Sequence, residues 1–326
     1  MKVLVTGASG FIGSYLTKML TEQGYEVKVL VRPNSDLTAL ETLDIEIITG
    51  DIQDRDCLTK AMNGCQQVYH GAAQCTKSNV PKTAYYAINV EGAKNLAQIA
   101  DKTSLERLVY LSTAGVYGTN KQSKVNEQTT PKPNTYYRTT KLLAEQVFLQ
   151  AYQEQGLPVV IARLSGVCGE GYLSWLGLAR EIATGNFALI GTGENYYHLG
   201  HISDVVQGLK LCAQTPGIEG EIYNLAAKEP IKVKNIVKAI ADTLQVNYTG
   251  KQLPAFPYQS YNAITEWIYH NLGRQIPGHH RYDIFLGNRY NDISKAMTEL
   301  NYSPQIAPEE AIKQLVSWYR SQGYLS

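Results

Sequence analysis

The chain opens with an apolar run that ends in three evenly spaced glycines, and this pattern predicts a strand, a tight turn and a helix. Residues 3–5 are Val-Leu-Val, and Gly7, Gly10 and Gly13 follow. We expect Gly7 to let the chain turn, Gly10 to let a pyrophosphate approach the backbone, and Gly13 to let the helix lie close to the strand. The helix N-terminus would direct free N–H groups and a partial positive charge at the phosphates. The opening therefore predicts a nucleotide-binding site.

Strand-like and helix-like segments alternate through the first half of the chain. We expect strands at residues 2–6, 26–31, 45–49, 67–70, 107–112 and 158–163. We expect helices at 11–23, 54–62, 83–100 and 135–155, and two more near the end of the chain at 292–300 and 308–321. This alternation predicts an α/β fold with a doubly wound parallel sheet of the Rossmann type. Ligands of such sheets bind beyond the carboxyl ends of the strands.

The second half of the chain has a looser pattern that is rich in aromatic residues. The stretch 254–290 contains five tyrosines, one tryptophan and three histidines. We predict that residues 1–165, with returning segments at about 201–230, form the nucleotide-binding domain. Residues from about 166 to 200 and from 231 to 326 would form a smaller substrate-binding region.

Composition excludes several classes of partner. The chain has 30 basic and 29 acidic residues, a net charge of +1 and no basic cluster, so we expect no nucleic-acid partner. There is no apolar run of about 18 residues, so we expect no transmembrane segment and no membrane partner. The five cysteines are scattered without a C-x-x-C pair, which predicts free thiols, no metal site and a cytoplasmic location.

A tyrosine and a lysine four residues apart mark the start of the predicted helix 135–155. At this spacing Tyr137 and Lys141 extend from one helix face. A free phenol has a pKa of about 10 and is a weak base at neutral pH. A nearby ammonium group lowers that pKa, so the pair could act as acid and base. The alternative is a solvated helix face without a catalytic role.

Two hydroxyl groups follow the predicted strand 107–112. Ser112 and Thr113 begin the segment Ser-Thr-Ala-Gly-Val-Tyr-Gly. A hydroxyl here would lie beside Tyr137 and could hydrogen-bond a reacting oxygen. The alternative is turn capping, which is common at strand ends.

Together these motifs resemble the extended short-chain dehydrogenases/reductases, also called the NAD-dependent epimerase/dehydratase family. The similarity extends over nearly the whole chain. Matching segments lie at residues 6–13, 50–51, 69–73, 89–92, 111–118, 137–141, 162–164, 201–205, 223–225 and 288–296.

The resemblance implies a role for each matching residue. Tyr137 would be the general acid/base, and Lys141 would tune its pKa and contact a ribose. Thr113 would be the catalytic hydroxyl, with Ser112 as the second candidate. Asp51 with Ile52 would contact the adenine, and Asn89 would support the cofactor or its helix. The remaining cofactor-binding positions would be Gly7, Ser9, Gly10, Phe11, Ile12, Gly13, Ala72 and Ala73.

The end of the second predicted strand favours NADP over NAD. An acidic residue at this point would bind the ribose 2′-hydroxyl of NAD. The sequence here is Val31-Arg32-Pro33, and a guanidinium group suits a 2′-phosphate. NAD stays the alternative because Asp36 lies nearby, although we interpret Asp36 as a helix cap.

The residues before the segment His201-Ile-Ser-Asp204 bear on the substrate. Nucleotide-sugar members of the family usually carry an arginine there for the diphosphate, and Tyr197 stands at that position. This departure, with Val31-Arg32, resembles the dihydroflavonol-reductase and 3β-hydroxysteroid-dehydrogenase branch. Arg281 or Arg289 could still bind a phosphate or form structural ion pairs.

We therefore expect an NAD(P)-dependent oxidoreductase that acts on a hydroxyl or carbonyl group of a small molecule. The alternatives are a nucleotide-sugar 4-epimerase or dehydratase with bound NAD, and a non-catalytic cofactor-sensing protein. Family members often dimerise through the helices that correspond to 83–100 and 135–155, so a homodimer is also expected.

Overall fold

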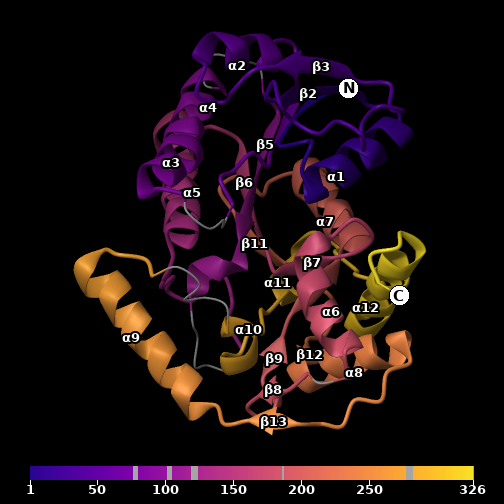
Figure 1. The fold of residues 1–326 in the computed structure, drawn as a ribbon. Helices are drawn as coiled ribbons and strands as arrows, with labels where there is room; N and C mark the ends of the chain where they lie inside the picture. Colours follow the sequence, from indigo (N-terminus) through magenta and orange to yellow (C-terminus); the bar gives the residue numbers. More distant parts are fainter. Residues whose placement is uncertain (76–79, 101–104, 119–123, 186, 277–281, 326) are drawn as a thin grey trace.

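The centre of the fold is a seven-stranded parallel sheet with the strand order β11-β6-β5-β4-β1-β2-β3 (Figure 1). The computed structural model describes residues 1–75, 80–100, 105–118, 124–185, 187–276 and 282–325. The strands are β1 (Lys2–Thr6), β2 (Glu26–Val31), β3 (Glu46–Thr49), β4 (Gln67–His70), β5 (Arg107–Thr113), β6 (Val159–Leu164) and β11 (Ile222–Leu225). The strand order reverses between β1 and β4, which confirms the predicted doubly wound sheet.

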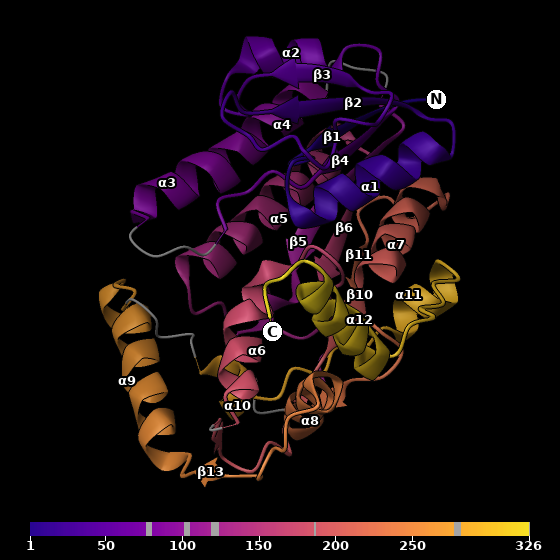
Figure 2. The ribbon, with the colours of Figure 1, turned by 45° about the vertical axis from the view of Figure 1, so that its right-hand side comes forward.

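Helices cover both faces of the sheet because its strands are apolar on both sides (Figure 2). On one face, α1 (Phe11–Glu22) and α7 (Ile202–Gln214) bury side chains such as Leu16 and Leu209 against the strands. On the other face, α2 (Arg55–Met62), α4 (Gly92–Ala100) and α5 (Tyr136–Gln155) bury Leu58, Leu96 and Phe148.

The predicted helix 83–100 is interrupted by a wider turn. It consists of α3 (Lys82–Tyr86), a π-helical turn at Ala87–Glu91, and α4. Gly92 follows the turn, and a Cβ atom there would lie 2.5 Å from Cδ1 of Ile52, so a larger residue would require the Ile52 side chain to move. Periodicity predicted the helix but not the extra residue in its middle.

The chain beyond β6 builds a second layer at the carboxyl ends of the strands. Its helices are α6 (Leu176–Ala183), α8 (Val233–Leu244), α9 (Phe256–Leu272), α10 (Asp283–Leu286), α11 (Ser294–Glu299) and α12 (Pro308–Ser321). Its short strands pair as β7 (Gly166–Cys168) with β10 (Leu199–His201), β9 (Tyr196–Tyr197) with β12 (Ile231–Lys232), and β8 (Leu189–Ile190) with β13 (Gln252–Leu253).

A separate hydrophobic cluster holds this layer together, with α6, α8 and α12 packed around residues such as Trp175 and Ile236. The domain boundaries expected from the sequence stay a prediction. All five cysteines are free thiols. No helix in the described ranges has the length and apolar character to cross a membrane.

Candidate active site

The glycine turn between β1 and α1 brings three backbone segments into contact. Gly7 has a φ of +76°, and a Cβ atom there would lie 2.7 Å from the backbone N of Ala72 after β4. A Cβ atom on Gly13 would lie 2.1 Å from the carbonyl O of Gly7, so α1 can approach the turn only without a side chain. Gly10 is the N-cap of α1, and no side chain caps its N–H groups. These groups are available to an anion.

The turn lines a hollow of about 190 Å³ beside the ends of β2 and β3. Its walls include the predicted residues Gly7, Ser9, Gly10, Arg32, Asp51, Ile52, Ala72 and Ala73. Ser35 also lines it, and its hydroxyl accepts a hydrogen bond from the Arg32 backbone N–H at 3.1 Å. Ser35 could not be predicted from the sequence, because only the turn after β2 returns its hydroxyl to Arg32.

Asp36 does not cap a helix as predicted. Its carboxylate accepts hydrogen bonds from Thr38, from the backbone N–H at 3.0 Å and the hydroxyl at 2.7 Å, and these bonds lower the pKa of Asp36. Residues 36–38 therefore form a local turn closed by the aspartate side chain, which is another common role of aspartate besides helix capping. Asp36 is absent from the lining of the hollow at Arg32.

A second hollow continues from the glycine turn to α5. It is lined by Gly7, Gly10, Phe11, Ile12, Gly13, Ala73, Ser112, Thr113, Tyr137 and Lys141, among others. The two hollows share Gly7, Gly10 and Ala73, so they form one continuous cleft from Arg32 to Tyr137. The structure therefore brings Thr113, Tyr137 and Lys141 together with the glycine turn.

Lys141 is buried beneath this cleft. Its side chain is 2% exposed in the folded chain, and its Nζ lies 4.1 Å from the centroid of the Tyr110 ring. Burial lowers the pKa of Lys141 to about 8. The face of the aromatic ring offers the ammonium group a partly compensating cation–π contact.

The electrostatic environment of Tyr137 differs from the expectation. Burial raises the pKa of Tyr137, and the neighbouring Cys75 raises it further. Arg138, rather than the predicted Lys141, is the cation that lowers it, and burial outweighs this effect. The hydroxyl of Tyr137 therefore keeps its proton at neutral pH in the protein alone.

The two predicted hydroxyl residues serve different neighbours. Ser112 is 4% exposed, and its hydroxyl donates to the carboxylate of Glu145. That carboxylate forms a buried ion pair with Arg163, with Nη2 and Oε2 2.7 Å apart. The Thr113 hydroxyl accepts from the Gly115 N–H at 3.0 Å and lies at the cleft beside Tyr137. The side chains of adjacent strand residues point to opposite faces, which explains the division.

Asn89 supports the helix rather than lining either hollow. It is 2% exposed and lies in the π-helical turn. Its Oδ1 accepts from the Gln74 N–H at 2.7 Å, and its Nδ2 donates to the Thr140 hydroxyl at 2.9 Å. The bonds join the loop after β4 to the turn of α5 that carries Lys141. The predicted cofactor contact of Asn89 stays a prediction.

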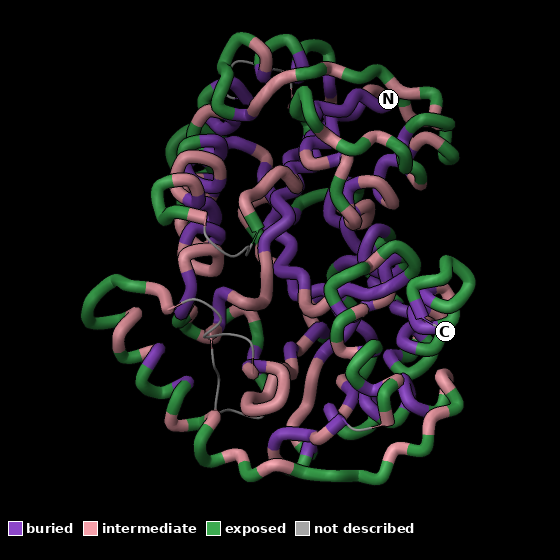
Figure 3. Tube along the Cα trace, in the orientation of Figure 1, coloured by how far each residue is buried: buried purple, intermediate pink, exposed green. Residues whose placement is uncertain are grey.

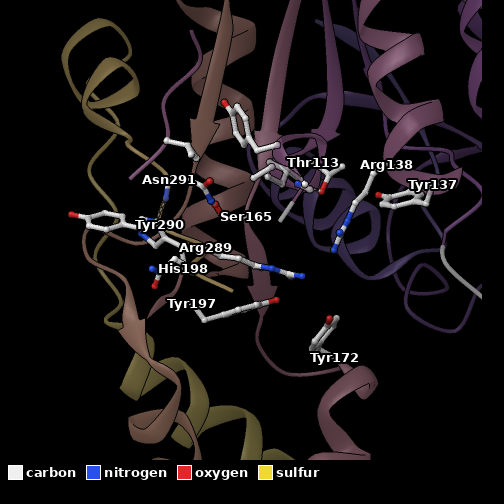
Figure 4. Close-up of a pocket in the computed structure, with 18 residues that line it drawn as sticks. Thr113, Tyr137, Arg138, Ser165, Tyr172, Tyr197, His198, Arg289, Tyr290 and Asn291 are labelled. Carbon is white, nitrogen blue, oxygen red and sulfur yellow. Dashed lines mark hydrogen bonds between the residues drawn. The ribbon is translucent and has the colours of Figure 1, made fainter. Parts of the chain in front are cut away.

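A third cavity of about 310 Å³ adjoins the cleft at Thr113 and Tyr137 (Figure 4). Tyr172, Tyr197 and Tyr290 supply aromatic walls. Arg138 and Arg289 also line the cavity, and no aspartate or glutamate does among the described residues. Its size is at the lower end of ordinary small-molecule sites.

The two arginines of the cavity share one carboxylate. Asp283 Oδ2 lies 2.9 Å from Nη2 of Arg138 and 3.1 Å from Nη2 of Arg289. The Arg289 guanidinium also lies 5.4 Å from the centroid of the Tyr197 ring. Arg289 is thus both a structural ion-pair partner and a lining residue, which were the two predicted alternatives. Arg281 lies outside the described residues.

His198 lines the same cavity as a neutral imidazole. Burial lowers the pKa of His198 to about 4. Its Nδ1 accepts from the Asn291 N–H at 3.2 Å, so its Nε2 carries the proton and donates to the carbonyl O of Ala227 at 2.8 Å. These bonds fix the orientation of the imidazole ring. Because the ring is neutral, the charged side chains that line the cavity are Arg138 and Arg289.

Comparison with known proteins adds to this geometry. Residues 3–226 match the NAD dependent epimerase/dehydratase family. A putative dihydroflavonol 4-reductase of Synechocystis is 30% identical, and the alignment covers 98% of this chain and 95% of that protein. The crystal structure of gox2253 is 27% identical, with a TM-score of 0.85 and 99% of each chain covered. DesIV, a dTDP-glucose 4,6-dehydratase of Streptomyces venezuelae solved with NAD bound, is 25% identical, with a TM-score of 0.80 over 100% of this chain and 99% of that one.

Proposed function

Because the chain belongs to the NAD-dependent epimerase/dehydratase family and is an NAD(P)-dependent enzyme, we propose that it is a reductase of a small carbonyl compound that uses NADP(H). The meeting of the glycine turn, Thr113, Tyr137 and Lys141 in one cleft carries this proposal. An extended dinucleotide in this cleft would place its adenosine end at Arg32 and its nicotinamide end at Tyr137, since the two hollows share the glycine turn.

The Tyr137 hydroxyl is suited to donate a proton to a carbonyl oxygen. When bound, the nicotinamide nucleotide supplies the hydride that the carbonyl carbon gains. Tyr137 would donate its proton to the oxygen, which becomes a hydroxyl, and would recover a proton from solvent. The raised pKa of Tyr137 keeps the phenol protonated, which is the form that the reductive direction requires.

Two neighbours would position the reacting groups. Thr113 would hold the substrate oxygen through its hydroxyl, since Thr113 and Tyr137 both line the cleft and the adjoining cavity. Lys141 would donate to ribose hydroxyls from beneath the cleft.

The contacts at the end of β2 support NADP over NAD. Arg32 and Ser35 both line the hollow, and a guanidinium and a hydroxyl can donate to a 2′-phosphate. Asp36, the one acidic residue that could bind the 2′-hydroxyl of NAD from this turn, directs its carboxylate to Thr38.

The substrate would carry an oxygen-rich or acidic group near its carbonyl. Arg289 donates to Asp283 through Nη2, and within the described ranges its other guanidinium N–H groups have no side-chain partner at the cavity. A nucleotide-sugar epimerase or dehydratase is the second candidate, since the same two arginines could hold a diphosphate. Tyr197 in place of the expected arginine favours the reductase.

The cofactor preference can be tested by calorimetric binding of NADPH and NADH. We expect wild type to bind NADPH more tightly, and Arg32→Ala to lose this preference while its NADH affinity stays the same. Arg180→Ala, on α6, is the matched control and should bind as wild type does. Equal wild-type affinities for the two nucleotides would exclude the NADP assignment.

The reaction type can be tested with a panel of carbonyl compounds and nucleotide sugars. Net loss of NADPH absorbance identifies a reductase, and turnover without net loss identifies an epimerase or dehydratase. Tyr137→Phe should abolish either reaction and leave NADPH affinity unchanged. Full activity of Tyr137→Phe would contradict the proposed role of the phenol.

A further inference from the structure

Helix α9 exposes its apolar side chains to solvent. In the described part of the chain, eleven large hydrophobic side chains are exposed, and five of them lie on this one helix. Phe256 is 76% exposed, Ile264 60%, Trp267 59% and Leu272 58%. Figures 1 and 3 show α9 at the periphery of the second layer, with exposed residues along its length. The usual arrangement of an amphipathic helix is therefore reversed.

The inner face of α9 is polar, and hydrogen bonds attach it to the rest of the molecule. Asn262 and Thr265 are buried. The Asn262 Nδ2 donates to Oδ1 of Asp283 at 3.4 Å, and the Tyr269 hydroxyl bonds the Thr139 hydroxyl at 2.6 Å. Because these polar contacts hold the helix in place, the outward position of its apolar residues does not depend on their burial.

The outward residues form one continuous face. At 3.6 residues per turn they cover roughly 160° of the helix circumference. The face comprises Phe256, Pro257, Ser260, Tyr261, Ile264, Trp267, Ile268, Asn271 and Leu272. None of these side chains is charged. We call this set the α9 face.

Positive charge flanks the α9 face at its two ends. Lys251 precedes the helix and Arg274 follows it, and both are exposed. Lys82 and Lys132 line a hollow together with His270 at the C-terminal end of α9. Glu266 is the one carboxylate between residues 251 and 276, and it accepts a hydrogen bond from Asn134 on the inner side.

This charge pattern indicates what covers the face. If two copies paired through α9, their basic residues would come together without carboxylates to pair with them. An uncharged face with Trp, Phe, Ile and Leu and with basic residues at its ends is instead typical of helices that lie in the interface of an anionic bilayer. Tryptophan and tyrosine are also favoured at that depth.

We propose that the α9 face docks this enzyme onto the surface of membranes that contain anionic lipids. Phe256, Ile264, Trp267 and Leu272 enter the interfacial region, and Lys251 and Arg274 contact the lipid headgroups. The helix lies in the membrane plane, so no transmembrane segment is required. This inference is independent of the reaction proposed above, because it rests on α9 alone.

Vesicle binding provides the test. We expect the full-length protein to sediment with vesicles of equal parts phosphatidylcholine and phosphatidylserine, and to bind vesicles of phosphatidylcholine alone more weakly. Of the three tryptophans, Trp175 is buried, Trp318 is half-buried and Trp267 is exposed on α9, so vesicles should shift the fluorescence to shorter wavelength. Trp267→Phe should lose this shift and still sediment with the anionic vesicles.

Matched variants separate the two contributions. Ile264→Glu combined with Trp267→Glu should lower the affinity for anionic vesicles by at least about tenfold. Ile47→Glu, which changes an exposed apolar residue on β3, is the control and should bind as wild type does. Lys251→Gln and Arg274→Gln should each lower the affinity by about fivefold on anionic vesicles only. Circular dichroism and melting temperature would verify that each variant is folded.

Two results would overturn the proposal. One is the failure of folded wild-type protein to bind anionic vesicles. The other is a wild-type dimer, seen by sedimentation without lipid, that becomes monomeric in the Ile264→Glu, Trp267→Glu variant. That second result would assign the α9 face to a second copy of the chain.

Discussion

The buried ammonium group of Lys141 predicts how stability depends on pH. Burial lowers the pKa of Lys141 in the folded chain to about 8. In the unfolded chain a lysine has a pKa of about 10.4, so between these two values the unfolded chain binds more protons than the folded chain. The free energy of unfolding that depends on Lys141 therefore rises with pH across this interval. Replacement of Lys141 by methionine removes this dependence.

The two pKa values set the size of the effect. They imply that the charge of Lys141 destabilises the fold by about 3 kcal/mol near pH 7 and by about 1 kcal/mol near pH 9.5. The stability of Lys141→Met relative to wild type should therefore be greater near pH 7 than near pH 9.5, by about 2 kcal/mol. The difference between the two pH values does not depend on how well methionine packs in the site.

Urea unfolding of both proteins at the two pH values measures this quantity. Titrations of other groups occur in wild type and variant alike, so they cancel in the comparison. Lys18→Met, which removes an exposed charge from α1, is the control and should show no such change between the two pH values. A gap between wild type and Lys141→Met that is constant with pH would refute the reasoning, because it would mean that the ammonium group is not desolvated in the folded chain.

Three further substitutions test the framework of the site. Glu145→Gln should destabilise the protein by about 3–5 kcal/mol in urea unfolding, because it leaves Arg163 buried without a counter-charge, and an unchanged midpoint would contradict this. Gly13→Ala places a methyl group against the Gly7 carbonyl, so we expect a loss of about 1–3 kcal/mol of stability and weaker nucleotide binding by calorimetry. Wild-type affinity in this variant would show that α1 can move away from the turn. Asn89→Ala should lower the free energy of unfolding by about 1–3 kcal/mol, since it removes the partners of Gln74 and Thr140, and a neutral effect would show that water replaces the amide.

Features with a local signature could be predicted from the sequence. The three glycines, the alternation of strands and helices, and the four-residue spacing of Tyr137 and Lys141 each reflect the geometry of a turn or a helix. Helix and strand bounds that depend on such patterns agree with the structure to within one or two residues in most elements, as for β1 and α12.

Features that depend on contacts between distant segments could not be predicted. The carboxylate of Glu145 accepts a hydrogen bond from the Ser112 hydroxyl, and Asp283 forms ion pairs with two arginines that are far apart in the chain. The extra residue in the π-helical turn directs Asn89 at Gln74 and Thr140. The spacing of apolar residues in the sequence does not reveal this residue. The reversed polarity of α9 is visible only once its inner neighbours are known, because the sequence does not state which face packs inward.

Two adjacent residues at the end of β5 should respond differently to mutation, because their side chains alternate across the pleat of the strand. Both residues line the cleft, but the Ser112 hydroxyl bonds the Glu145 carboxylate of the buried ion pair, whereas only Thr113 also lines the adjoining cavity with Tyr137. A systematic mutational scan of this strand end should therefore find loss of protein abundance at residue 112 and loss of turnover with normal abundance at residue 113. Exchange of the two residues would disturb both properties at once, so neither can stand in for the other during evolution.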